Sequence, residues 1–330
     1  MTVLSKIVPK AALNSRVHRL RSFEVADGNC YVKRDDELGF GVSGTKVRKY
    51  SSFLPSFLKE KPNEAVIIGS AYSNHVLSLS QLLKENGIEP ILFLLGDPEC
   101  KLQGNLLLTA LIAELKNIHW VSRGKWDAID QIASEYASKR LGDNVRAIVV
   151  PKGANCASAL PGAITLALDV LRNEEELGIE FDHLFIDSGT GLTACALLLA
   201  FALMGKKTFI HIVMVAGGKE EFMQTLSERK TDLEALLAQT LPSPTLFNLY
   251  LPSVAPSFGA VNAQIFNTVA ELAKKEGFIT DPVFTAKLFH EGKKIISEQG
   301  LKGNILFIHS GGGLGLTGFQ NEMAKIVRGM

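Results

Sequence analysis

Cysteine is scarce in this 330-residue sequence, which has four in all, at positions 30, 100, 156 and 195. No two of them form a C-x-x-C pair, and no cysteine and histidine cluster has the spacing of a metal site. The sequence therefore predicts neither a disulfide framework nor a metal centre. We expect four reduced thiols in a cytoplasmic protein, with Cys156 and Cys195 as small buried side chains.

A surplus of charge is also lacking, since 35 basic residues face 34 acidic ones and the formal net charge is +1. That balance gives no electrostatic reason to expect nucleic acid or an anionic membrane as a partner. No uninterrupted apolar run reaches the ~18 residues of a membrane-spanning helix. The N-terminal segment lacks the apolar core and the small-residue cleavage site of a secretion signal. We therefore expect a cytoplasmic protein without membrane attachment.

The chain has no low-complexity tract, internal repeat or clean linker, although it is longer than a single core comfortably allows. Two interlocked lobes are therefore expected. The hydrophobic pattern predicts strands at 65–69, 90–96, 118–121, 146–151, 183–187, 208–215 and 304–309, and one more within the proline-bearing segment 241–256. It predicts helices at 74–85, 102–115, 126–140, 192–204, 220–238, 260–276 and 283–298. Apolar strands that alternate with helices favour an α/β fold with parallel sheets covered on both faces.

Three turns follow predicted strands, at 69–75, 188–193 and 310–313. In an open parallel sheet, ligands bind at such turns. The turn 188–193 (SGTGLT) suits an anion, because glycine lets the backbone approach closely and the next helix offers free N–H groups. It is neither a Walker loop nor a complete dinucleotide fingerprint, since no Gly-Lys-Ser/Thr follows and residue 194 is alanine. The alternative is an ordinary tight strand–helix turn.

Two other segments contain polar residues that have structural as well as functional explanations. Ser73 or Asn74 could cap the helix that follows, and His75 could be a satisfied side chain in its first turn. Upstream, the glycines of 41–44 precede three cations, at 46, 48 and 49. These cations could belong to a solvated helix start. Positive charge opposes the helix dipole there, however, and such local conflicts are typical of functional sites.

Taken together, these segments resemble one family of enzymes. The stretch VKRDDELGFGVSGTKVRKY (32–50) resembles the cofactor-lysine segment of 1-aminocyclopropane-1-carboxylate (ACC) deaminases and D-cysteine desulfhydrases, which reads roughly KRDD…GGNK-x-RKL. GSAYSNHV (69–76) resembles their G-x-QSNHV turn, and DSGTGLTA (187–194) resembles their phosphate loop. TDPVFTAK (280–287) resembles LDPVYTGK, and ILFIHSGGGLGL (305–316) resembles the closing strand and glycine turn. The five matches occur in the same order along the chain.

The resemblance implies the fold of tryptophan-synthase-β-like (fold type II) enzymes, which use pyridoxal 5′-phosphate (PLP). That fold is a two-lobed, three-layer αβα structure with mainly parallel sheets. The resemblance implies a large PLP-binding domain formed by 1–47 and 155–330, with a small α/β domain, 48–154, inserted between them. It also implies a homodimer that acts on a small amino acid, with no metal and with neither nucleic acid nor membrane as a partner.

By the same resemblance, Lys46 carries PLP as a Schiff base and serves as the general base. The phosphate contacts that it implies are Thr190, Gly191, Leu192 and Thr193. Asn74 is placed beside the ring hydroxyl and Thr285 near the ring nitrogen. A threonine cannot keep that nitrogen protonated as a carboxylate can, which would favour elimination over chemistry that requires a stronger electron sink.

On the substrate side, the resemblance implies that Ser73 is catalytic and holds the substrate carboxylate or moves a proton. Asn74 and His75 are implied as further substrate contacts. Phe258 and Phe284 stand where the family usually has tyrosine. Phenylalanine keeps the aromatic wall around the substrate but has no O–H to donate a hydrogen bond or transfer a proton.

These features predict a PLP-dependent deaminase, of the lyase or hydrolase class, that abstracts an α-proton and eliminates a β-substituent to give a keto acid and ammonia. D-cysteine desulfhydrase-like activity is favoured. ACC deaminase activity, which yields 2-oxobutanoate and ammonia, is the alternative. The two missing phenols also allow a PLP-binding protein with little catalysis. A nucleotide-binding α/β enzyme without PLP is the least favoured hypothesis, because no complete nucleotide motif is present.

Overall fold

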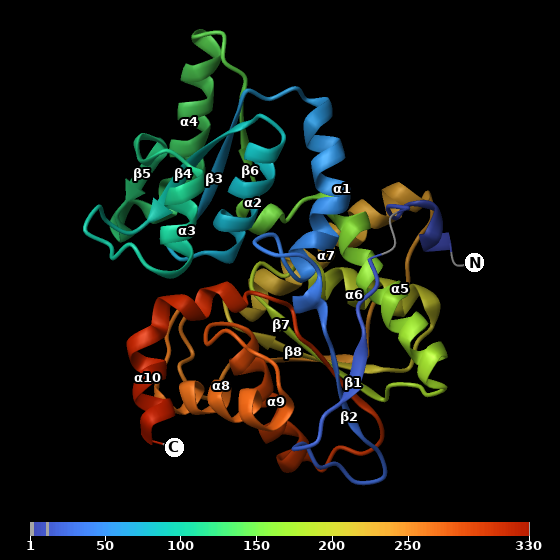
Figure 1. The fold of residues 1–330 in the computed structure, drawn as a ribbon. Helices are drawn as coiled ribbons and strands as arrows, with labels where there is room; N and C mark the ends of the chain where they lie inside the picture. The colour runs from blue at the N-terminus through green and yellow to red at the C-terminus, as the bar shows by residue number, and fades with distance from the viewer. Residues whose placement is uncertain (1–2, 11–12, 330) are drawn as a thin grey trace.

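The computed structural model describes residues 3–10 and 13–329, and its strands form two sheets in two lobes (Figure 1). The larger sheet has the strand order β1-β2-β10-β7-β8-β9, and the smaller has the order β5-β4-β3-β6. All neighbouring strands are parallel except β1 and β2. The predicted α/β fold with mainly parallel sheets is therefore confirmed. None of the helices in the described ranges combines the length and the apolar character that crossing a membrane requires.

The smaller sheet is covered by helices on both faces. Its strands are β3 (Glu64–Ser70), β4 (Glu89–Leu95), β5 (Ile118–Val121) and β6 (Ala147–Val150). Its helices are α2 (Asn74–Glu85), α3 (Gly104–Ile112) and α4 (Ile129–Gly142). Successive side chains of a strand point to opposite faces, so Ile67 packs in one core with Leu79 of α2, while Val66 packs in another with Ile129 of α4.

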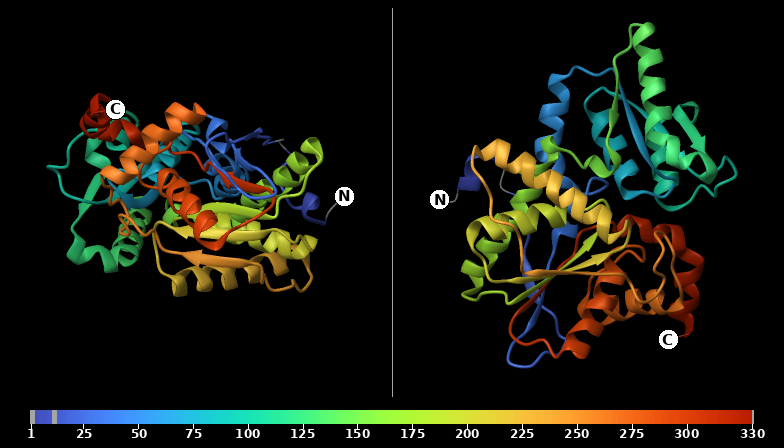
Figure 2. Two further views of the ribbon diagram at one scale, coloured as in Figure 1. Left: turned by 90° about the horizontal axis from the view of Figure 1, so that it is seen from below. Right: turned by 180° about the vertical axis from the view of Figure 1, so that it is seen from behind.

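The larger sheet is also sandwiched between helices, as Figure 2 shows. Its strands are β1 (Val17–Arg19), β2 (Cys30–Lys33), β7 (His183–Ser188), β8 (Phe209–Met214), β9 (Phe247–Tyr250) and β10 (Ile305–Ile308). Helices α5 (Leu160–Leu177), α6 (Leu192–Met204) and α7 (Lys219–Leu237) lie on one face, and α9 (Thr285–Gln299) lies on the other with α8 (Ala263–Glu276) and α10 (Gln320–Gly329). Ile186 of β7 packs in the core on the α6 side, whereas Phe185 packs with Phe289 of α9.

Helix α1 (Thr45–Lys59) is anchored by a buried cluster of ionic groups in the larger lobe. The Arg48 guanidinium donates to both carboxylate oxygens of Asp35, at 2.6 and 2.7 Å, and to Asp169 of α5 at 2.6 Å. Lys33 of β2 donates to the same Asp169 oxygen and to Asn173. Because these charges are buried and paired, removing one would leave its partners unpaired in the interior, and the cluster fixes the direction of α1.

The sequence patterns located most elements, indicated α1 only as a possible helix start, and missed four others. Helices 74–85 and 192–204 and strand 118–121 were predicted with the bounds that the structure has. Strand β1 was missed because it has only three residues, and β2, although as long as β5, was missed because its sequence CYVK ends in a buried lysine rather than an apolar residue. Helix α10 was missed because none of its residues is buried. Helix α5 was missed although it has 18 residues, and its start carries the pair Pro161-Gly162, a dipeptide typical of turns. Proline is well tolerated in the first turn of a helix.

Candidate active site

Lys46 lies in the first turn of α1, where that helix meets the turn after β10. Gly44 precedes the helix with φ +66°, and a Cβ added to it would lie 2.0 Å from the carbonyl oxygen of Ser310. The next residue, Thr45, donates its N–H to the same oxygen at 3.0 Å. Such close backbone contact requires glycine. It places Lys46 at the carboxyl end of the larger sheet, where ligands bind in open parallel sheets.

Two carboxylates act electrostatically on the Lys46 amine. Burial lowers the pKa of Lys46, and Asp187 and Asp281 partly oppose that shift. Burial raises the pKa of Asp187 to about 6, and the nearby charge of Asp281 contributes to this rise. Oδ1 of Asp187 is buried and has no hydrogen-bond partner among the described residues. A lysine with a lowered pKa is closer to the neutral form that can act as a nucleophile or base.

The start of α6 has the geometry that suits an anion, and we call it the cradle. Gly191 precedes α6 with φ +90°, and no side chain caps the free N–H groups of the first turn. Thr190 is held from two sides: its carbonyl accepts from Asn155 at 2.8 Å, and Gly153 packs so closely that an added Cβ would lie 2.5 Å from the Thr190 hydroxyl. Uncapped N–H groups at the positive end of a helix dipole suit a phosphate.

Lys49 is a cation beside this cradle that the sequence reasoning did not select. Its Nζ is buried and donates to the carbonyl of Gly153 at 2.6 Å. Burial lowers the pKa of Lys49 to about 7, and the nearby Lys46 charge contributes. An anion bound at the cradle would favour the charged form of this amine. The signal available in the sequence was its place in the cation cluster at 46–49.

Ser73 and Asn74 open helix α2 from the smaller lobe. Ser73 Oγ accepts from the N–H groups of His75 and Val76, so it is an N-cap, as the structural interpretation predicted. Its hydroxyl hydrogen is still available to a ligand. Asn74 Oδ1 accepts from Asn105 at 2.7 Å, and a Cβ added to Gly312 would lie 2.7 Å from Asn74 Nδ2. The amide of Asn74 therefore faces the glycine turn of the larger lobe.

His75 is buried rather than exposed on the first turn of α2. Its Nδ1 lies 2.7 Å from the hydroxyl of Tyr50, and its Nε2 is buried without a hydrogen-bond partner in the described structure. Burial holds the pKa of His75 well below its usual value, and the charges of Lys49 and Lys46 add to the shift. The imidazole is therefore neutral at pH 7. An unpaired buried nitrogen is costly, which favours a role in contacting a ligand.

Thr285 opens α9 and is fully buried. Its hydroxyl donates to Asp281 Oδ2 at 2.9 Å and accepts from the Asp281 N–H at 3.0 Å. Asp281 is also fixed by the backbone N–H groups of Val283 and Phe284. A hydroxyl whose hydrogen is already donated to a carboxylate can serve a further partner only as an acceptor. The sequence comparison identified Thr285 but assigned no role to the Asp281 behind it.

Phe258 and Phe284 form an aromatic pair at the edge of the site. Their ring centroids are 5.9 Å apart in an edge-on arrangement, and Phe258 is 48% exposed. A Cβ added to Gly189 would lie 3.3 Å from the Phe284 ring, so this pair borders the strand–helix turn that leads to the anion cradle. The pair is an apolar wall with no group able to transfer a proton.

His309 connects two segments of the site and was not selected from the sequence. It is fully buried at the end of β10, and its pKa is lowered by burial, so it is neutral. Nδ1 accepts the Gly311 N–H at 3.4 Å, and Nε2 therefore donates to the Ile279 carbonyl at 2.8 Å. The glycine turn is thereby tied to the loop that leads to Asp281.

The structure brings the predicted residues into one region between the two lobes. Asn74 meets Gly312, which also lies near Asp281, and Lys46 is coupled by charge to Asp187 and Asp281. The anion cradle adjoins this group through Lys49. Within the described ranges, no cluster of three or more histidine, cysteine, aspartate or glutamate side chains is placed to hold a metal ion.

Comparison with known proteins agrees with this arrangement. A family model described as pyridoxal-phosphate dependent enzyme matches residues 9–311. The chain therefore belongs to the family of PLP-dependent enzymes. The cofactor and enzyme class predicted from the sequence are confirmed.

Several individual proteins are similar to this chain in sequence or in structure. A putative ACC deaminase of Pyrococcus abyssi is 25% identical over 300 residues, covering 90% of this chain and 88% of the relative. A D-cysteine desulfhydrase of Yersinia enterocolitica is 27% identical over 302 residues, covering 89% of each. The crystal structure of an ACC deaminase homologue matches with a TM-score of 0.83 at 22% identity over 98% of both chains. A tomato threonine deaminase matches with a TM-score of 0.60 at 14% identity over 98% of this chain and 95% of its own. The predicted fold type II architecture is thereby confirmed.

Proposed function

We propose that this protein is a PLP-dependent lyase that deaminates a small amino acid by α-proton abstraction and β-elimination, with D-cysteine as the favoured substrate. The proposal rests chiefly on Lys46, a lysine with a lowered pKa that is coupled by charge to Asp187 and Asp281 at the carboxyl end of the larger sheet. The relatives named as deaminases and desulfhydrases support it. Hydrolase, the other class predicted from the sequence, is wrong, because the relatives' reactions are those of lyases, in which the bond to the leaving group breaks by elimination.

The residues present fit PLP. The cradle of Thr190–Thr193 would hold its phosphate through backbone N–H groups, and Lys49 would neutralise part of the phosphate charge. Lys46 would bond to its aldehyde carbon, and Asn74 would contact the ring hydroxyl. When bound, PLP supplies an electron sink for the negative charge that develops at the substrate α-carbon.

Proton transfer is assigned to Lys46. The Lys46 Nζ would take the α-proton of a bound substrate, and its lowered pKa would keep the amine available as a base. Ser73, whose Oγ already accepts two backbone N–H groups, donates its O–H to the substrate carboxylate. His75 contacts the substrate as a neutral imidazole through the buried Nε2 that has no protein partner.

The pair formed by Thr285 and Asp281 sets the ring nitrogen's environment. Because the Thr285 hydrogen is donated to Asp281, the oxygen is left as an acceptor, which favours a protonated ring nitrogen. The sequence alone suggested the opposite, since an isolated threonine could not stabilise that proton. We therefore assign Asp281 as a positioning residue that acts through Thr285.

The missing phenols at Phe258 and Phe284 favour D-cysteine over ACC. A thiolate is a good leaving group and needs less help from a proton donor than the opening of a cyclopropane ring does. ACC deaminase activity is the second candidate, and the names of several relatives favour it. A PLP-binding protein with weak catalysis is the third, motivated by the same two phenylalanines.

The assembly of the chain is part of the proposal. We propose a large domain formed by 1–47 and 155–330 and an inserted small domain, 48–154. All four strands of the smaller sheet lie within 64–150, which supports that division. The family resemblance supports a cytoplasmic homodimer.

Trapping the cofactor tests Lys46. Borohydride reduction of the yellow holoenzyme should fix the cofactor covalently to the peptide that contains Lys46, as peptide mass spectrometry would reveal. Lys46→Ala should abolish the trapping, whereas Lys59→Ala, at an exposed lysine of the same helix, should leave it unchanged. Label on another lysine would refute the assignment.

A substrate panel tests the reaction. D-cysteine, L-cysteine, ACC and D- and L-serine would each be assayed for keto acid and ammonia. Release of pyruvate, ammonia and sulfide from D-cysteine is the expected result. Turnover of ACC alone would favour the second candidate. A holoenzyme that turns over no member of the panel would favour the PLP-binding protein.

A further inference from the structure

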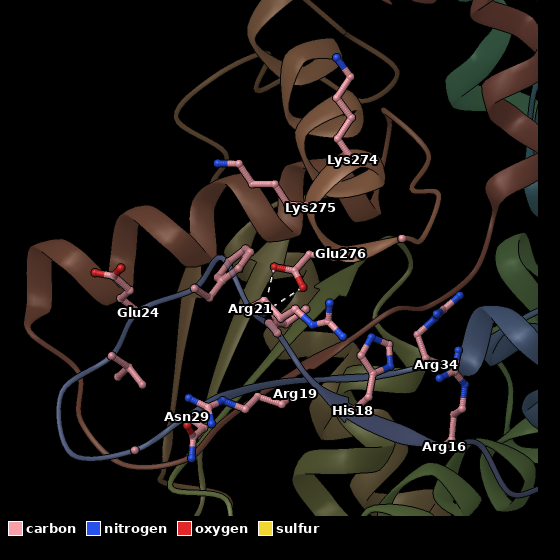
Figure 3. A pocket seen from close by; sticks show the side chains of 15 residues that line it. Arg16, His18, Arg19, Arg21, Glu24, Asn29, Arg34, Lys274, Lys275 and Glu276 are labelled. Atoms are coloured by element: carbon pink, nitrogen blue, oxygen red, sulfur yellow. Dashed lines mark hydrogen bonds between the residues drawn. The ribbon is translucent and has the colours of Figure 1, made fainter.

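A cavity lies outside the candidate active site, along the edge of the larger sheet (Figure 3). We call it the basic pocket. Strand β1 and the loop that follows it form one side, and the last turn of α8 forms the other. Its volume is about 1090 Å³, which is as large as pockets that hold small organic ligands, typically about 300–1,000 Å³.

Cations predominate in the lining of the basic pocket. Six arginine and lysine side chains face two glutamates there. Three of the cations are already paired: Arg16 with Glu37, Arg34 with Asp36, and Lys275 with Glu271. The other three are Arg19, Arg21 and Lys274.

Those three cations, Arg19, Arg21 and Lys274, are exposed, and no acidic side chain in the described part of the chain lies within ion-pair distance of them. Glu276 keeps its negative charge but forms no ion pair with them, because its oxygens are directed at neutral donors. Its carboxylate accepts the backbone N–H groups of Arg21 and Ser22 and the Ser22 hydroxyl. Figure 3 shows Glu276 directed at that backbone. The three free cations outnumber the two glutamates of the lining, Glu24 and Glu276, so the pocket keeps an excess of positive charge contributed by two separate elements.

We propose that the basic pocket binds a small polyanion, a compound with at least two phosphate or carboxylate groups. The free cations come from both sides of the pocket, so a ligand with several anionic groups can contact more of them than a single ion can. Charge-assisted hydrogen bonds from arginine to phosphate or carboxylate are among the stronger polar contacts in proteins. This site is distinct from the phosphate cradle at α6, and its occupancy does not depend on the proposed reaction.

The position of the basic pocket suggests how its ligand would act. The α8 turn at Lys274–Gly277 continues through Phe278 and Ile279 to Asp281 of the catalytic site. The Arg34 guanidinium lies 5.2 Å from the centre of the Phe278 ring. An anion that moved Arg34 or the α8 turn would therefore shift the loop behind the catalytic site, and we assign the pocket a regulatory role.

Calorimetry on the PLP-loaded holoenzyme tests the site, because bound PLP blocks the α6 cradle. Inorganic pyrophosphate and citrate would be titrated separately at low salt. The triple variant Arg19→Gln/Arg21→Gln/Lys274→Gln would be compared with a matched control, Arg123→Gln/Lys125→Gln/Lys139→Gln, which removes three exposed cations of the smaller lobe. We expect affinity to fall about tenfold or more in the first variant and less than about twofold in the control.

Each outcome of the titrations supports or contradicts a stated part of the proposal. Binding of pyrophosphate alone identifies a phosphate ligand, and binding of citrate alone identifies a carboxylate ligand. No binding of either anion, or equal binding by both triple variants, would overturn the proposal. Saturating anion should also shift the absorbance of bound PLP in the native holoenzyme and in the control. An unchanged absorbance would overturn the regulatory role.

Discussion

Replacing Gly153 by alanine perturbs the phosphate cradle without removing any group assigned to the cofactor. Gly153 has φ +66°, and an added Cβ would lie 2.5 Å from the Thr190 hydroxyl, against an ordinary contact of 3.4 Å or more. The cradle must therefore retreat by about 1 Å, and N–H groups aimed at a phosphate lose their geometry. Losing one hydrogen bond to a charged group costs about 2 kcal/mol, which weakens binding roughly 30-fold.

Gly178 provides the matched control for this substitution. It has φ +65°, and nothing lies within 4 Å of the Cβ that alanine would add. In both variants an alanine must adopt a left-handed backbone conformation, which should lower the free energy of unfolding by about 1–2 kcal/mol. Only Gly153→Ala should also weaken PLP binding.

Absorbance titration of the apoenzymes with PLP measures the affinity, and urea unfolding measures the stability. If Gly153→Ala binds PLP as tightly as Gly178→Ala does, the turn at α6 is not the phosphate site.

Three further predictions concern the ionic cluster, pH and the aromatic wall. Arg48→Met should lower the free energy of unfolding in urea by about 3–5 kcal/mol, because it leaves buried carboxylates without a partner. Arg16→Met, at an exposed ion pair, should lower it by at most about 1 kcal/mol. Equal losses would contradict the structural role of the cluster. Burial raises the pKa of Asp187 to about 6 in the folded chain. The folded state thus holds this proton more tightly than the unfolded state, whose pKa is about 3.9, so apoenzyme stability should fall as pH rises from 4 to 6, by up to about 3 kcal/mol. Asp187→Asn should remove that part of the slope, and an unchanged slope would show that another group causes it. Phe258→Tyr combined with Phe284→Tyr should raise turnover of ACC by about tenfold or more if a proton donor is limiting; no rise would show that the hydroxyls do not limit the reaction.

The cation cluster at 46–49 shows which features of the candidate site the sequence could predict and which it could not. The sequence indicated an unusual concentration of positive charge at a helix start, and the family resemblance singled out Lys46. The structure separates only Arg48 from the other two side chains. Lys46 and Lys49, three residues apart, lie on one face of α1 near enough for the Lys46 charge to lower the pKa of Lys49, whereas Arg48 is buried against Asp35 and Asp169. Neighbouring residues of a helix point in different directions, so a cluster in sequence is only partly a cluster in space.

The sequence pattern could not predict contacts between residues that lie far apart in the chain. Asp281 was visible in a matched motif, but its hydrogen bond to Thr285, and therefore the character of the threonine oxygen, depends on side-chain orientation. The basic pocket is formed by β1, which is too short to leave a pattern, and by the end of α8, more than two hundred residues later.

The family resemblance singled out Lys46, while the sequence by itself determined the α/β alternation and the glycine turns at the strand ends. Each of these is a local property, because hydrophobic period and turn chemistry depend on neighbouring residues. Only the tertiary structure decided the partial burial of Lys46, the pairing of Arg48 and the charge left free beside β1. Burial and ion pairing depend on which distant segments fold against a residue, and they set the pKa shifts and charges on which the proposed chemistry at Lys46 depends.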